Sequence, residues 1–130
     1  MKIFYLIFTS ILILTACSSD EDVLSPFEKV NYRVIAYQSL SEEELSTLTK
    51  DWKTAPVDIG RYRKEDNIHF ITIDGGVKLS TGLYDPNMIL NNNQALVTVT
   101  FNTKDDPWVG PITVIINPEN DAVVGQVPRA

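Results

Sequence analysis

The chain has 130 residues, of which 44% are hydrophobic and 22% charged, with one cysteine and a formal net charge of −6. This length fits one domain that can bury a core, and a lone cysteine excludes an intramolecular disulfide. The acidic balance argues against nucleic acid as a partner.

The first 16 residues have the features of a secretory signal. Lys2 provides a short positive start, and residues 3–14 form an apolar, uncharged run. The run has the length of a signal-peptide core and is too short to span a bilayer comfortably. It ends in the tetrapeptide Leu14-Thr15-Ala16-Cys17. This tetrapeptide resembles the lipobox of bacterial lipoproteins, which implies cleavage before Cys17 and a diacylglyceryl group on its sulfur.

An ordinary signal peptide with a chance cysteine, or a short membrane anchor, would share the apolar run. The lipobox interpretation is favoured because the single cysteine stands where a lipobox needs it. Since two acyl chains anchor a protein stably, we expect attachment to the extracytoplasmic face of a membrane, without spanning it. A Gram-positive cell membrane and a Gram-negative outer membrane both remain open. Lys2 is the only charged side chain before Cys17, so the mature chain has net charge −7 and is expected to stand off an anionic membrane.

Three segments are therefore predicted: a signal peptide over 1–16, a lipidated flexible tether over 17–28, and a single domain over 29–130. The tether prediction depends on the acidic cluster at 20–22 and on Pro26, which oppose regular structure.

A strand and a helix are predicted at the start of the domain. Residues 30–38 are rich in β-branched and aromatic side chains, which favours a first strand. Ser41 and Glu44 form a capping box, which predicts the start of a helix of roughly three turns. The side chains expected on its buried face are Leu45, Leu48 and Trp52.

The rest of the chain is predicted as strands and turns. The expected strands are 57–63, 68–73, 77–84, 94–102, 108–117 and 122–125. Segment 77–84 alternates weakly, so it is either an edge strand or partly a loop. Segment 94–102 alternates clearly, which predicts one buried and one wetter face, and Gly110-Pro111 predicts a bulge or a sheet edge. The expected fold class is α+β, an antiparallel sheet of about five or six strands with one helix packed on one face.

Two further resemblances concern the domain. Residues 51–57 (DWKTAPV), with 97–106 (VTVTFNTKDD) and the following hairpin, resemble a group of small lipoproteins of low-GC Gram-positive bacteria with no assigned activity. The hairpin 112–125 resembles the closing hairpin of PepSY-type domains, which are secreted α+β modules linked to peptidase inhibition. The matching residues are hydrophobic and turn residues, so no functional residue carries over.

The sequence contains no recognisable catalytic motif, and we expect neither an enzyme nor a cofactor. His69, the single histidine, lies inside an apolar run and is expected to be structural or on the surface. One histidine and a lipidated cysteine cannot supply the usual zinc ligands. The oxygen-rich segments 105–106 and 117–121 do not match a calcium loop, and turn chemistry explains them. No metal site is predicted.

A basic cluster of Arg61, Arg63 and Lys64 lies next to Tyr62, and Arg61, Tyr62 and Arg63 are the candidate interaction face. The two arginines share one face of a strand and could meet a carboxylate-bearing partner, although a solvated strand face has the same pattern. Three functions follow, in decreasing order of preference. The first is a module that binds a protein or peptide of the cell envelope at an edge strand. The second is a small-ligand carrier or sensor with a lined pocket, and the third is an enzyme using His69 or a carboxylate pair in a cleft.

Overall fold

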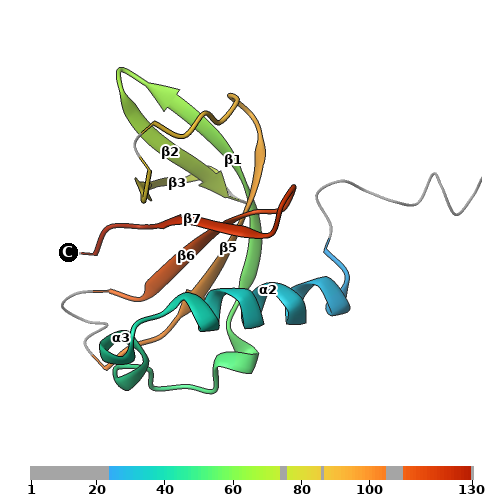
Figure 1. Ribbon diagram of the computed structural model, residues 1–130, viewed down its shortest axis with the longest axis vertical. Coiled ribbons are helices and arrows are strands. Elements are labelled where there is room, and N and C mark those ends of the chain that lie inside the picture. The colour runs from blue at the N-terminus through green and yellow to red at the C-terminus, as the bar shows by residue number, and fades with distance from the viewer. Residues whose placement is uncertain (1–23, 74–75, 86, 105–109, 130) are drawn as a thin grey trace, which may run out of the picture.

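The structure, a computed structural model, describes residues 24–73, 76–85, 87–104 and 110–129. It is an α+β fold in which one main helix lies across an antiparallel sheet (Figure 1). The helical elements are α2 (Pro26–Ser39), α3 (Glu42–Ser46) and the 3-10 helix η1 (Trp52–Thr54). The strands are β1 (Val57–Glu65), β2 (Ile68–Ile73), β3 (Val77–Ser80), β4 (Gly82–Leu83), β5 (Ala95–Phe101), β6 (Ile112–Asn117) and β7 (Ala122–Gln126).

Helix α2 occupies the segment predicted as a first strand, so that prediction is wrong. Its start is a capping box: the Glu28 amide donates to Ser25 Oγ at 3.2 Å, and the Ser25 amide donates to Glu28 Oε1 at 3.1 Å. Pro26, expected to oppose regular structure, is the first helical residue, where its missing N–H costs nothing. Burial of Tyr32 and Ala36 on one face outweighs the β-propensity of the segment. The helix also begins inside the predicted tether.

The predicted capping box of Ser41 and Glu44 is confirmed, but the three-turn helix after it is not. Helix α3 has five residues and ends at Ser46. Leu48 then forms an isolated bridge with Thr103, which draws the chain towards the sheet. The single helix packed on the sheet is therefore α2. Trp52 follows in η1 and stacks on Tyr37 of α2 with ring centroids 4.5 Å apart.

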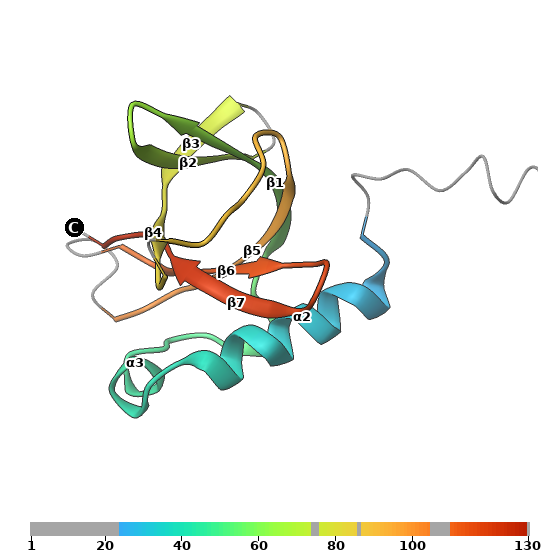
Figure 2. The same cartoon turned by 45° about the horizontal axis from the view of Figure 1, so that its top comes forward.

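The sheet has seven antiparallel strands, more than the five or six expected, in the order β3-β2-β1-β5-β6-β7-β4. Its two ends come from one stretch of chain, because only Thr81 separates β3 from β4. The Thr81 amide donates to the carbonyl of His69 in β2 at 3.0 Å, while the Tyr84 amide donates to that of Val124 in β7 at 2.9 Å. The sheet therefore curls nearly into a barrel (Figure 2), and the predicted strand 77–84 divides between its two ends.

Local turn chemistry explains two of the connections. Asp66 and Asn67 have φ of 50° and 65°, as a tight β1–β2 hairpin requires. Strand β1 extends to Glu65, so the turn is shorter than the segment 64–67 between the predicted strands 57–63 and 68–73. The turn before β7 is confirmed at 118–121.

The bulge or sheet edge predicted at Gly110-Pro111 has a counterpart elsewhere. The register of β6 against β7 shifts between Ile115 and Ile116. Trp108, in the predicted strand 108–117, and residues 74–75, between the predicted strands 68–73 and 77–84, lie outside the described residues.

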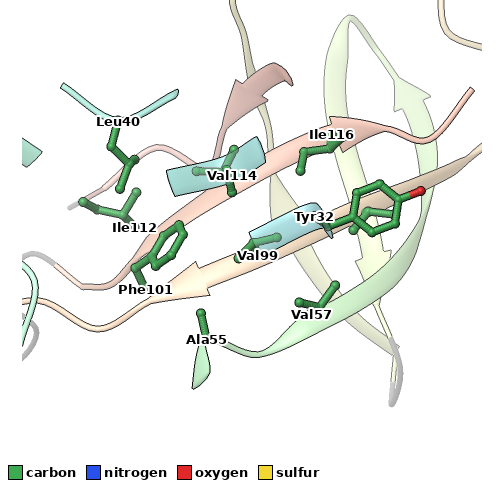
Figure 3. Close-up of a cluster of buried hydrophobic side chains, with 11 residues drawn as sticks. Tyr32, Leu40, Ala55, Val57, Val99, Phe101, Ile112, Val114 and Ile116 are labelled. Atoms are coloured by element: carbon green, nitrogen blue, oxygen red, sulfur yellow. The ribbon is translucent and has the colours of Figure 1, made fainter. Parts of the chain in front are cut away.

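The sheet has a buried cluster on each face. Beneath α2 (Figure 3), the first cluster comprises Tyr32, Ala36, Leu40, Ala55, Val57, Val97, Val99, Phe101, Ile112, Val114 and Ile116. The second fills the concave side of the sheet and comprises Tyr62, Ile71, Leu96, Ile115 and Val124. Strand β5 contributes to both clusters, and both Leu96 and Val97 are buried. The expected wetter face of 94–102 is therefore wrong, since curling of the sheet covers that face as well.

Candidate functional site

A cavity of about 290 Å³ lies at one end of the curled sheet. Its lining comes from β1, β2 and the connection between β4 and β5, as Tyr62, Lys64, His69, Asn87, Met88, Ile89 and Leu90. The lining combines an apolar side with hydroxyl, imidazole, amide and ammonium groups. Such a combination is typical of a site for small ligands.

Alternation along the β1–β2 hairpin places the polar groups of this cavity. Tyr62 and Lys64 are two residues apart in β1, so they share the concave face. Lys64 is opposite His69 in the antiparallel register. The Tyr62 hydroxyl and His69 Nδ1 share a hydrogen bond, and the two rings are 5.8 Å apart between centroids.

The connection that closes the other side of the cavity is tied to β1. The Asn93 amide donates to the Tyr62 carbonyl at 2.6 Å, and the Tyr62 amide donates to the Gln94 carbonyl at 2.9 Å. Met88 packs against the concave cluster, whereas Ile89 is 90% exposed. The apolar wall is therefore partly anchored in the core and partly open to solvent.

The structure separates the three residues of the predicted interaction face. Arg61 and Arg63 lie on the outer face of β1, half-buried and exposed respectively. Tyr62 is 2% exposed and belongs to the concave cluster, so it cannot share a surface with them. Arg61 Nη1 donates to the Asn93 carbonyl at 3.3 Å. The predicted lipidation site, Cys17, lies outside the described residues.

His69 is half-buried at the cavity, with an aromatic hydroxyl as its partner. The preferred prediction for His69 was a structural or surface role, and only the least preferred of the three predicted functions, an enzyme, placed it in a cleft. Alternation in β1 and β2 would have placed Tyr62, Lys64 and His69 on one face of a hairpin, had the register been known. No sequence signal identified residues 87–90 as the opposite wall.

The described residues contain no group of three or more His, Cys, Asp and Glu side chains that could hold a metal ion. In the 117–121 turn, Asn117 Oδ1 accepts from the Glu119 amide at 3.1 Å, and Asn120 Oδ1 accepts from the Ala122 amide at 3.1 Å. These oxygens stabilise the turn, as its composition predicts. The other oxygen-rich segment, 105–106, lies outside the described residues.

Burial raises the pKa of the Tyr62 hydroxyl above its usual range. The folded chain therefore holds this proton more tightly than the unfolded chain, whose tyrosines ionise near about pH 10. The stability from a neutral Tyr62 is fully present below that pH and is lost as pH rises through the raised pKa. We expect the free energy of unfolding to fall above about pH 10, and to fall less steeply in Tyr62→Phe.

Denaturant titrations between neutral pH and pH 11 would measure the free energy of unfolding of the wild type and of Tyr62→Phe as a function of pH. Tyr32 and Tyr84 also have raised pKa values, first of all through burial, so part of the slope should survive in the variant. At neutral pH, Tyr62→Phe should cost about 1 kcal/mol through loss of the hydrogen bond to His69. If the free energy of unfolding fell equally steeply with pH in the wild type and in Tyr62→Phe, the raised pKa assigned to Tyr62 would be contradicted.

No protein-family model matches the chain, and neither a curated protein nor a solved structure matches it. Within the described part of the chain, no helix is long and apolar enough to cross a membrane.

Proposed function

We propose that this protein is a lipid-anchored binding protein of the bacterial cell envelope, which takes a small ligand at the open end of its curled sheet. The observation that carries the proposal is the cavity of about 290 Å³ at Tyr62, Lys64 and His69. Its volume is close to the lower end of the range for ligand pockets, which begins at about 300 Å³. It therefore suits a small molecule better than a macromolecular segment.

The lining specifies the chemistry of the ligand. Met88, Ile89 and Leu90 offer an apolar wall. Because the described residues that line the cavity include Lys64 and no carboxylate, a ligand with an anionic group beside a short apolar part is favoured. His69 Nδ1 is directed at Tyr62, so its Nε2 is the ring nitrogen with which it can contact such a ligand. We propose binding without chemical conversion.

Octanoate and its neutral counterpart octanol are suitable first probes. In an NMR titration of the protein, octanoate should shift the amides of residues 62–64, 69 and 87–90, and octanol should bind more weakly. Lys64→Ala should weaken octanoate binding about tenfold, the loss expected for one charge-assisted hydrogen bond. Lys78→Ala is the matched control, because Lys78 is an exposed cation outside the cavity lining. Equal affinities of the two variants, or shifts spread evenly over the surface, would contradict the proposal.

A second candidate is capture of an extended peptide at the free edge of β3. This strand ends the order of the sheet, so in the described part of the chain its far edge is not paired with a strand. Val77 is 50% exposed there, and an added strand could use the backbone of this edge. A peptide ligand bound in this way would shift the amides of residues 77–80 and leave those of Tyr62 and His69 unchanged.

The anchor is tested separately from the ligand. In cells that express the full chain, we expect it in the membrane fraction, with a diacylglyceryl group on Cys17 detected by mass spectrometry. Cys17→Ala should block the lipid attachment and the cleavage that follows it, because both need this sulfur. A wild-type chain with an unmodified Cys17 would rule out the lipoprotein assignment without affecting the cavity.

A further inference from the structure

The outer side of α2 carries apolar side chains that the fold leaves exposed or only half-buried. Phe27 is 82% and Val30 55% exposed, and Val34 is half-buried. Their spacing of three and four residues places them on one helix face, opposite the buried Tyr32 and Ala36. Figure 2 shows α2 below the sheet, with its far side turned away from the strands. We call Phe27, Val30 and Val34 the outer stripe.

The outer stripe continues into a shallow hollow between α2 and η1. The hollow measures about 190 Å³, is lined almost entirely by apolar atoms, and is formed by Val30, Arg33, Trp52 and Lys53. Lys53 Nζ lies 5.9 Å from the centre of the Trp52 ring. An aromatic and aliphatic surface is thus flanked by two cations. Lys and Arg side chains can lie along such a surface while their charged ends stay in water.

We propose that this face docks on the surface of a lipid bilayer, an inference that rests on the proposed lipid anchor at Cys17. The cap of α2, Ser25, is eight residues after Cys17. Eight residues span at most about 29 Å when fully extended. The start of α2 therefore cannot leave the neighbourhood of the membrane, and its outer stripe meets lipid at a high local concentration.

The composition of the face matches that partner. Helices that lie in the plane of a membrane interface combine an apolar face, often aromatic, with flanking Lys and Arg. Lys53 and the guanidinium of Arg33, whose Nε donates to the Ala55 carbonyl at 2.7 Å, carry positive charges that complement anionic headgroups. The neighbouring carboxylates each accept a hydrogen bond in a helix cap. Glu28 accepts from the Ser25 amide in the α2 cap, and Asp51 accepts from the Lys53 amide in the η1 cap. The net charge of −7 on the mature chain predicted a domain held away from an anionic membrane. Contact with the membrane depends instead on the charge and polarity of the surface that faces it, which here is apolar and flanked by Arg33 and Lys53.

Docking by α2 would also orient the candidate site. Helix α2 covers one face of the sheet, while the ligand cavity belongs to the opposite, concave side. The β1–β2 hairpin that carries Tyr62, Lys64 and His69 lies at the far end of the molecule from α2 (Figure 1). The cavity would then face away from the membrane, open to solutes of the envelope.

The test uses the full, lipidated chain in vesicles of phosphatidylethanolamine and phosphatidylglycerol that contain a quencher lipid. An environment-sensitive fluorophore is placed at Val30→Cys or, as the matched control, at Glu65→Cys on the exposed tip of the β1–β2 hairpin. The lipidated Cys17 sulfur does not react with the label. We expect quenching by lipid to be about twofold or more stronger at position 30 than at position 65. Phe27→Asp should abolish this difference while the protein still floats with the vesicles.

The outcomes separate the two proposals. Equal quenching at both positions in a chain that floats overturns the docking and leaves the anchor intact. A chain that does not float and shows no quenching overturns the anchor and the docking together. A spectral change at position 30 that occurs without vesicles and grows with protein concentration shows that a second copy covers the face, which also overturns docking on lipid.

Discussion

Gly125→Ala is expected to cost about 3 kcal/mol or more of the free energy of unfolding. A β-carbon at this position would lie 2.1 Å from the Gly82 carbonyl oxygen and 2.9 Å from its carbon. Both atoms belong to the backbone of β4, which pairs with β7 at this point. No side-chain rotation can relieve the clash, so the two strands must separate. The variant should lose the contact that closes the sheet, and urea denaturation followed by circular dichroism would measure the loss.

Gly76→Ala is the matched control for this prediction. A β-carbon at Gly76 meets no atom within 4 Å, although its φ of +78° makes any side chain strained. This variant should cost only about 1 kcal/mol, the penalty for placing alanine at a positive φ. If Gly125→Ala cost no more than Gly76→Ala, close packing of β4 on β7 would be contradicted.

Leu96→Ala is expected to destabilise the protein by about 2–5 kcal/mol. Leu96 is fully buried on the concave side of the sheet, among side chains from four other strands. Removing most of its side chain loses transfer free energy and leaves a cavity, since strands on all sides limit collapse. The alternation of the segment alone suggests a wetter face here and would predict a small effect.

Ile89→Ala provides the comparison, because Ile89 is 90% exposed at the edge of the ligand cavity. Its effect on stability should stay within about 0.5 kcal/mol. Thermal and urea unfolding of both variants would measure the difference. A cost for Leu96→Ala as small as that for Ile89→Ala would mean that the concave side is hydrated and the sheet is open.

Local signals explain most of the elements that were predicted from the sequence. The segment 68–73 is the strand β2, and β1, β5, β6 and β7 fall within a few residues of their predicted ranges. These strands are rich in β-branched residues and are bounded by turn residues, which act over short distances. The same reasoning failed at α2. Its capping box, Ser25 with Glu28, has the pattern found at Ser41 and Glu44, but Pro26 obscured it.

The candidate site was predictable only in part. His69 was identified as the single histidine, but its contact with Tyr62 depends on the register of β1 against β2. That register follows from the two-residue turn at Asp66 and Asn67, whereas the sequence predicted a longer turn over 64–67. The opposite wall, residues 87–90, has no regular structure, and tertiary contacts hold it against β1.

The sequence by itself determined the α+β class, the antiparallel hairpins and the capped start of α3. Each of these depends on residues that are neighbours in the chain. Only the tertiary structure decided that β3 and β4 end opposite sides of one sheet, that both faces of β5 are buried, and that a cavity forms at Tyr62 and His69. The physical reason is that β3 and β4 are too short to specify their partners. Their pairing comes from burial of the concave cluster, to which strands far apart in the sequence contribute together.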